Sequence, residues 1–113
     1  MNQIATFVKR SFLAALIGLA MLVVSSRPLR AQGDAEAVYN KKCAVCHAKD
    51  GSGNTVKGKQ LKVKSASDYK QASDEAAMIK IVTDGKGEMD AFKDQLTADQ
   101  IKGVVQYFRS LAK

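Results

Sequence analysis

Hydrophobic residues follow two different patterns, one before and one after residue 33. From Phe12 to Val24 they form a run of 13 residues that contains one glycine and no polar side chain. Later they recur at every third or fourth position among polar residues, which is the spacing of one face of an α-helix. No segment alternates between apolar and polar residues over five or more positions, as a half-buried strand would. The pattern therefore predicts an all-α fold with connecting loops.

The first two helices of this later part are predicted from the residues at their ends. Asp34 can accept hydrogen bonds from free backbone amides, so a helix is expected to begin there and reach Cys43. A second helix of about eleven residues is expected after Ser73, ending at Gly85, which tolerates a left-handed conformation. Its apolar positions fall at i, i+3 and i+4: Met78, Ile81 and Val82.

The last helix has the clearest sequence signal. Residues Thr97 to Gln100 form a capping box, in which both end side chains bond to backbone amides that the helix leaves free. The residues that follow have one apolar face: Ile101, Val104, Val105, Phe108 and Leu111. Two stretches, 48–67 and 86–96, lack either periodicity. The first, rich in glycine and lysine, is expected to be an ordered loop, and the second a short irregular segment.

The apolar run near the start has the features of a secretory signal peptide. Lys9 and Arg10 precede it, and a short segment follows it up to Ala31, where we expect cleavage. A helix that spans a bilayer needs about 20 apolar residues, so a retained membrane anchor is the weaker interpretation. We therefore divide the chain into a signal peptide, residues 1–31, and one small domain, residues 32–113.

The charge of the chain depends on this division. The full sequence has 18 basic and 11 acidic residues and a net charge of +7. Removal of residues 1–31 takes away four basic and no acidic side chains, which leaves a net charge of about +3. This excess does not indicate nucleic acid as a partner. The protein core of so small a domain supplies only about 3 to 5 kcal/mol, so a disulfide or a large apolar cofactor would stabilise it.

The candidate chemistry lies at residues 43–47, which read Cys-Ala-Val-Cys-His. Two thiols at this spacing can bond to the vinyl groups of one haem, while the histidine binds its iron. A disulfide, a thioredoxin-like redox pair and half of a zinc site are the alternatives. Zinc lacks further ligands, the redox pair lacks a βαβ setting, and a disulfide leaves His47, the only histidine, unexplained. We predict one haem c bound through Cys43 and Cys46, with His47 on the iron.

A second axial ligand is expected for an electron carrier, because an occupied position excludes small molecules from the iron. Methionine, lysine or an open position are the alternatives. Beyond the leader the sequence has two methionines, Met78 and Met89. Met78 belongs to the apolar face of the middle helix and is expected in the core. Met89 lies in the glycine-containing stretch 85–92, where backbone can approach a flat ligand closely, and is the better ligand.

The chain resembles the small bacterial class I cytochromes c in three features. These are the attachment motif after an N-terminal helix, the stretch that contains the methionine, and the closing helix. The chain is similar to the cytochromes c6 and c553 over roughly residues 34 to 112. The resemblance implies three to five helices wrapped around one covalently bound haem c, with the first and last helices crossing. At that crossing Ala35 and Tyr39 would meet Val104 and Tyr107.

The resemblance also implies that His47 and Met89 are the axial iron ligands and that electrons pass through an exposed haem edge. The family often has proline after the ligand methionine and in the loop after the histidine. This chain has Asp90 at the first position and Thr-Val-Lys, residues 55–57, near the second. A partly buried carboxylate at Asp90 would stabilise the oxidised haem and lower the reduction potential, whereas an exposed one would have little effect.

Lysines are concentrated on the side of the chain that would attach the haem. Seven lie between residues 41 and 64, against one acidic residue, Asp50. They are Lys41, Lys42, Lys49, Lys57, Lys59, Lys62 and Lys64. Such a lysine-rich face can direct a protein to acidic surfaces on membrane reductase or oxidase complexes. A solvated loop kept soluble by lysine is an equally good interpretation.

Together these features predict an exported electron carrier that is a monomer in the periplasm, with a thylakoid lumen as the alternative compartment. Its expected partners are redox proteins, not nucleic acid or a small-molecule substrate. A haem subunit tethered to a membrane complex by an uncleaved leader would have the same chemistry. A small haem peroxidase agrees less well, because the sequence has no second histidine for acid–base catalysis. The chain is therefore not expected to be an enzyme.

Overall fold

The computed structural model describes residues 29–113, with side chains from Asp34 onward. Residues 1–28, which hold most of the predicted signal peptide, lie outside this part. In chain order the helices are α2 (Leu29–Lys42), α3 (Ala44–His47), α4 (Val56–Gln60), α5 (Ala66–Ala72), α6 (Glu75–Asp84) and α7 (Ala98–Ser110). The described residues contain no strand, and none of their helices is long and apolar enough to cross a membrane. The predicted all-α fold is confirmed, with four helices longer than five residues and two of about one turn.

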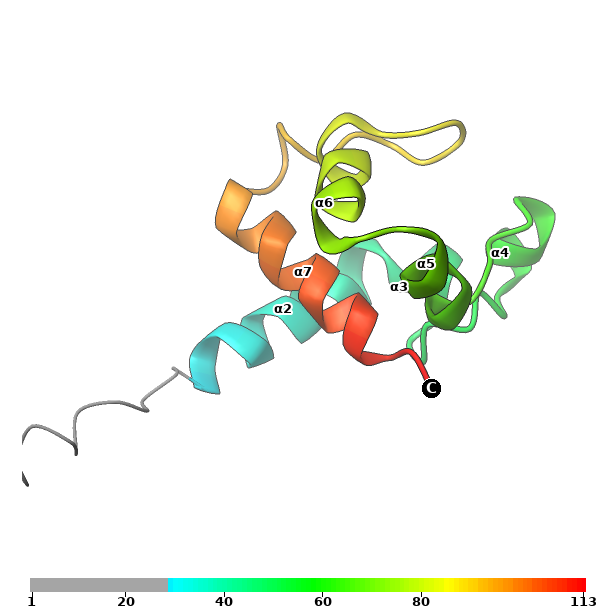
Figure 1. The fold of residues 1–113 in the computed structure, drawn as a ribbon, viewed down its shortest axis with the longest axis horizontal. Coiled ribbons are helices and arrows are strands. Elements are labelled where there is room, and N and C mark those ends of the chain that lie inside the picture. The colour runs from blue at the N-terminus through cyan, green and yellow to red at the C-terminus, as the bar shows by residue number, and fades with distance from the viewer. Residues whose placement is uncertain (1–28) are drawn as a thin grey trace, which may run out of the picture.

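Helices α2 and α7 cross at the centre of the fold (Figure 1). Tyr39 of α2 is only 1% exposed and packs against α7, with its ring centroid 5.3 Å from that of Tyr107. A Cβ atom built on Gly103 would lie 3.5 Å from the Cβ of Ala35, so the two small residues allow the helices to approach closely. The predicted crossing of the first and last helices is confirmed. Gly103 is a contact residue that the sequence pattern did not indicate.

Side-chain caps begin two of the helices where the sequence predicts them. The Thr97 hydroxyl accepts a hydrogen bond from the Gln100 amide at 3.2 Å, and the Gln100 side chain accepts one from the Thr97 amide at 2.9 Å. At α6 the Asp74 carboxylate accepts a hydrogen bond from the Ala77 amide at 2.7 Å. Gly85 follows α6 with φ of +78°, a left-handed conformation in which glycine is least strained.

Two helix boundaries differ from the prediction. Helix α2 begins at Leu29, so Asp34 lies inside the helix and is not its N-cap. An N-cap contributes only about 1 kcal/mol, and a helix extends past it where earlier residues add backbone hydrogen bonds. The expected loop up to Ser67 also contains α4 and the start of α5. A capping box between Ser65 and Asp68 begins α5. The spacing of these two residues in the sequence could have predicted this helix.

Helix α7 contacts α2, α5 and α6 and so connects the parts of the fold (Figure 1). The Arg109 guanidinium donates to the Ser73 carbonyl at 2.9 Å and lies 3.6 Å from the Met78 sulfur. Met78 is 5% exposed, which confirms its predicted place in the core. At the chain end, the Ser67 hydroxyl donates to the Lys113 carbonyl at 3.1 Å and accepts from the Lys113 amide at 3.0 Å. These bonds hold α5 and α6 against α7.

Helix α4 packs closely against the cysteine segment at Gly58, which is buried. A Cβ atom at this position would collide with the carbonyl oxygens of Cys46 and Gly53. Thr55 caps α4: its hydroxyl accepts from the Gly58 amide at 2.8 Å and donates to the Val45 carbonyl at 2.8 Å. The absence of a side chain at residue 58 is therefore required for this packing.

We expect Gly58→Ala to lower the free energy of unfolding by about 1–3 kcal/mol, because the added methyl group has no space between the two carbonyls. Gly103→Ala is the matched control, because a methyl group there makes an ordinary contact with Ala35. Alanine has a higher helix propensity than glycine, so the control should gain up to about 1 kcal/mol. Denaturant unfolding of both purified variants measures the difference. Equal effects of the two substitutions would contradict this account of α4.

Candidate haem site

The predicted attachment motif lies at the junction of α2 and α3. The amides of Cys46 and His47 donate to the Cys43 carbonyl at 3.1 and 2.9 Å, so residues 43–47 form one helical turn. Residues three apart on such a turn lie on the same side, and both cysteines are half-buried free thiols. The structure thus brings three of the four predicted site residues together, with both thiols placed to reach one ligand.

Burial shifts the pKa values of two side chains in this turn, the Cys43 thiol and the His47 imidazole. It raises the pKa of the Cys43 thiol to about 11, an effect that Lys42 partly offsets, so the thiol is protonated at neutral pH. No group of three or more histidine, cysteine or acidic side chains that could hold a metal ion lies among the described residues, which disfavours a zinc site. Burial also lowers the pKa of His47. The imidazole is therefore held neutral, and the neutral form is the one that binds a metal.

His47 lies in an aromatic environment and has a free buried nitrogen. Its ring centroid lies 5.1 Å from that of Phe108 and 6.0 Å from that of Tyr69. Its Nδ1 atom is buried and has no hydrogen-bond partner among the described residues. Buried polar atoms without a partner are rare, and one that persists is often explained by function. Nε2 is the nitrogen that would bind iron, so the unpartnered Nδ1 leaves this ring without the hydrogen bond that usually orients a metal-binding histidine.

The chain that follows the histidine is fixed by the helix crossing. Ala48 has φ of +64°, a left-handed conformation that is unfavourable for alanine. The Tyr39 hydroxyl donates to the Ala48 carbonyl at 2.6 Å, and the Gly53 amide donates to the His47 carbonyl at 2.9 Å. Tyr39 therefore supports the site, a role that the sequence alone did not reveal because Tyr39 and Ala48 meet only when the chain is folded.

The structure shows the surroundings of the two positions at which this chain lacks the proline of its family, near Thr55 and at Asp90. Where the family often has proline, the Thr55 hydroxyl lies 2.8 Å from the Val45 carbonyl and 3.3 Å from that of Cys46. Hydrogen bonds to the motif thus give this loop the rigidity that proline would otherwise supply. Asp90 is exposed, so its effect on the reduction potential is expected to be small.

Met89, the fourth predicted residue, lies on a separate segment. It pairs with Lys86 through two backbone hydrogen bonds of 3.0 Å, which close a tight turn, and it is half-buried. The Phe92 amide donates to the Val82 carbonyl at 2.9 Å and ties the segment to α6. A Cβ atom on Gly85 would lie 2.8 Å from the Met89 carbonyl oxygen, so glycine permits this fold-back. No hydrogen bond among the described residues links Met89 to α3.

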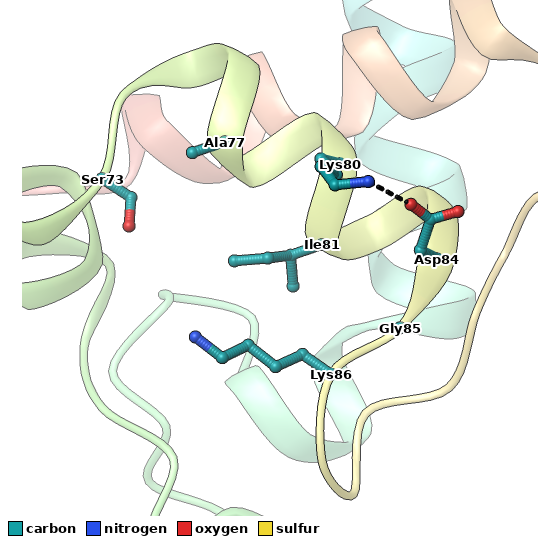
Figure 2. Close-up of a pocket in the computed structure, with 7 residues that line it drawn as sticks. All are labelled: Ser73, Ala77, Lys80, Ile81, Asp84, Gly85 and Lys86. Carbon is teal, nitrogen blue, oxygen red and sulfur yellow. Dashed lines mark hydrogen bonds and ion pairs between the residues drawn. The ribbon is translucent and has the colours of Figure 1, made fainter.

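A hollow of about 440 Å³ opens beside α6. Its lining consists of Ser73, Ala77, Lys80, Ile81, Asp84, Gly85 and Lys86. Figure 2 shows Ile81 and Lys86 extending into this hollow, while Lys80 and Asp84 form an ion pair of 2.9 Å with each other. The turn that carries Met89 begins at Lys86, so it shares a wall with the hollow. Cys43, Cys46 and His47 are not among the residues that line this hollow. The two free thiols and the buried neutral imidazole of the attachment turn fit a haem.

Comparison with known proteins agrees with this chemistry. Residues 30–108 match the family described as cytochrome C oxidase, cbb3-type, subunit III. A cytochrome c6 of Nostoc sp. (strain PCC 7120 / SAG 25.82 / UTEX 2576) is 37% identical over 103 residues, which cover 88% of this chain and 90% of that protein. A cytochrome c6 of Leptolyngbya boryana is 39% identical over 70 residues, which cover 62% of this chain and 80% of that protein.

A solved structure has the same fold. The KustC0563 c-type cytochrome superposes with a TM-score of 0.62 at 27% sequence identity and covers 71% of this chain and 99% of its own. The attachment turn, the all-α fold and these similarities lead to one assignment. The chain belongs to the c-type cytochromes, as a small class I member that carries one covalently bound haem c.

Proposed function

We propose that this electron-transfer protein is an exported, monomeric one-electron carrier, with haem bound through Cys43 and Cys46 and iron ligated by His47 and Met89. The observation that carries the proposal is the single helical turn that joins both cysteines to the only histidine. The bound haem supplies a centre that gains and loses one electron. The protein residues attach it, hold its iron ligands and limit the access of water.

Each site residue has a distinct role in this proposal. Thioethers from Cys43 and Cys46 prevent loss of the haem when the protein moves between partners. His47 donates a neutral imidazole nitrogen, and its burial keeps that nitrogen free of a competing proton. Met89 supplies a thioether sulfur, a ligand that raises the reduction potential of a c-type haem. Its turn is tied to α6, which would keep the sixth position occupied in both redox states.

A membrane-attached subunit is the second function that a specific observation favours. The matching family model is described as a subunit of an oxidase, whereas the curated relatives above are named cytochrome c6. The two functions differ in whether the leader, residues 1–31, is cleaved. Mass spectrometry of the exported protein decides between them, because cleavage after Ala31 gives a free periplasmic carrier and retention gives a tethered one.

The lysine-rich face is the proposed docking surface for redox partners. Six of its seven lysines are exposed, and Lys42 is half-buried with its ammonium 3.1 Å from the Gln95 side-chain oxygen. Between them Val45 is 62% and Val56 is 79% exposed. Two exposed apolar side chains that alternate along the chain with exposed lysines match the usual composition of an interface, with an apolar centre and a polar rim. The face therefore suits a partner that has an apolar contact ringed by acidic residues.

Covalent attachment is tested by expressing the full chain in a host that matures c-type haem. We expect the haem to remain bound after denaturation in the wild type and to be lost in the Cys43→Ala, Cys46→Ala double variant. The double variant should also lose most of its helical circular dichroism, because a domain of this size has a small core without haem. Native-like helix content in the haem-free variant would contradict this dependence, and loss of haem from the denatured wild type would contradict the attachment.

Ligation by Met89 is tested with two matched substitutions. We expect Met89→Leu to abolish the weak far-red sulfur-to-iron absorption band of the oxidised protein and to lower its reduction potential. Met78→Leu should retain both properties, because Met78 lies in the core between α6 and α7. Absorption spectra and a redox titration measure the two effects. A band that survives in Met89→Leu would assign the sixth ligand to another residue.

Docking through the lysine-rich face is tested with the anionic oxidant hexacyanoferrate(III). We expect the oxidation rate to fall with rising ionic strength, and to fall about two- to tenfold in a Lys57→Glu, Lys59→Glu variant at low salt. A Lys102→Glu variant is the control, because Figure 1 shows the start of α7 at the opposite side of the view from α4. Oxidation rates that change neither with ionic strength nor with the substitutions in α4 would contradict docking through the lysine-rich face.

A further inference from the structure

Among the residues that the structure describes, no hydrogen bond to Nδ1 fixes the orientation of the His47 ring. Its Nδ1 atom is buried and has no partner among the described residues. In most metal-binding histidines the second ring nitrogen donates to a carboxylate, a carbonyl or water, and that bond fixes the ring plane. Rotation of a histidine ring about its last side-chain bond otherwise has a broad range. Some other contact must therefore hold this ring.

Two aromatic rings contact His47 at steep angles. Phe108 of α7 lies 5.1 Å from it between centroids, with an interplanar angle of 68°. Tyr69 of α5 lies 6.0 Å from it, at 66°. The two rings are 6.1 Å from each other, so the three form a closed triangle. These values fall in the range of favourable edge-to-face contacts, in which rotation of one ring disturbs the other two.

Each of the two rings is held by a further contact of its own. The Phe108 ring stacks on Tyr39 of α2 at 6.0 Å and 26°. Tyr39 is fully buried, and its hydroxyl donates to the Ala48 carbonyl, one residue after His47. The Tyr69 hydroxyl accepts a hydrogen bond from the Lys64 amide at 3.4 Å. The Phe108 ring is thus held by α2, and the Tyr69 ring by the segment that precedes α5.

We propose that Phe108 and Tyr69 are positioning residues that fix the plane of the His47 ring by edge contacts, in place of a hydrogen bond to Nδ1. The inference rests on the proposed function, in which His47 ligates the haem iron. The plane of an axial imidazole determines which iron d orbital its π electrons overlap. It therefore determines how the unpaired electron of the oxidised haem is distributed over the macrocycle.

The holoprotein tests this directly, because histidine-specific ¹⁵N labelling marks a single side chain. Phe108→Leu and Tyr69→Leu each remove one ring and leave an apolar side chain. We expect both to shift the ¹⁵N resonances of His47 and to change the spacing of the haem methyl proton resonances in the oxidised protein. The larger change is expected for Phe108→Leu, since that ring is closer. Covalent haem should be retained.

Two control variants separate positioning from general loss of packing. Tyr107→Leu removes a ring from the same helix that contacts Tyr39 at 5.3 Å, and no ring contact of Tyr107 with His47 occurs among the described residues. Tyr69→Phe keeps the ring and loses the hydroxyl that accepts from the Lys64 amide. Tyr107→Leu should leave the haem methyl pattern of the wild type unchanged, and Tyr69→Phe should change it less than Tyr69→Leu does.

The outcomes that overturn the inference are unchanged spectra in both Leu variants, or an equal change in Tyr107→Leu. If Phe108→Leu fails to mature with haem, the comparison of Tyr69→Leu with Tyr69→Phe decides alone. The wild type tests the proposed function separately. Without a paramagnetic shift on its labelled histidine, His47 is not an iron ligand, whereas a shifted histidine with unchanged variant spectra rejects only the positioning role.

Discussion

Burial of Tyr39 at the crossing of α2 and α7 positions most of the haem-binding region. The ring packs against Val104 and stacks on Phe108, while the hydroxyl donates to the Ala48 carbonyl. One side chain thus connects the crossing to the backbone that follows His47. Desolvation raises the pKa of the Tyr39 phenol, so the hydroxyl stays protonated and keeps donating across the physiological range of pH. This bond and one from the Gly51 amide at 3.1 Å hold the carbonyl of Ala48, whose φ is +64°.

The size of the core explains why the cofactor belongs to the fold as well as to the function. Four of the ten buried apolar residues are alanines, and Tyr39 is the one large side chain that is completely buried in the described part. Small side chains allow the helices to approach closely, as between Ala35 and Gly103, but they bury little apolar area. The covalently bound haem c of this family adds a large apolar surface, and its covalent bonds keep it in place.

Side-chain contacts in this chain replace constraints that its family often builds with proline. Thr55 bonds to the carbonyls of Val45 and Cys46, and Gly58 lets α4 pack against the same turn. These contacts form on the inner side of α4, whereas the lysines of this region point to solvent. The same short segment can therefore hold the attachment turn rigid and present a charged surface to a partner.

The sequence by itself determined what depends on neighbouring residues: the helical periods, the capping box at Thr97, and the spacing of the attachment motif. Helix propensity and capping act within a few residues, so they can be read without a fold. Only the tertiary structure decided which distant side chains meet. The rings of Tyr69 and Phe108 reach His47 because α5 and α7 pack beside α3, and such contacts follow from three-dimensional packing that no local spacing encodes.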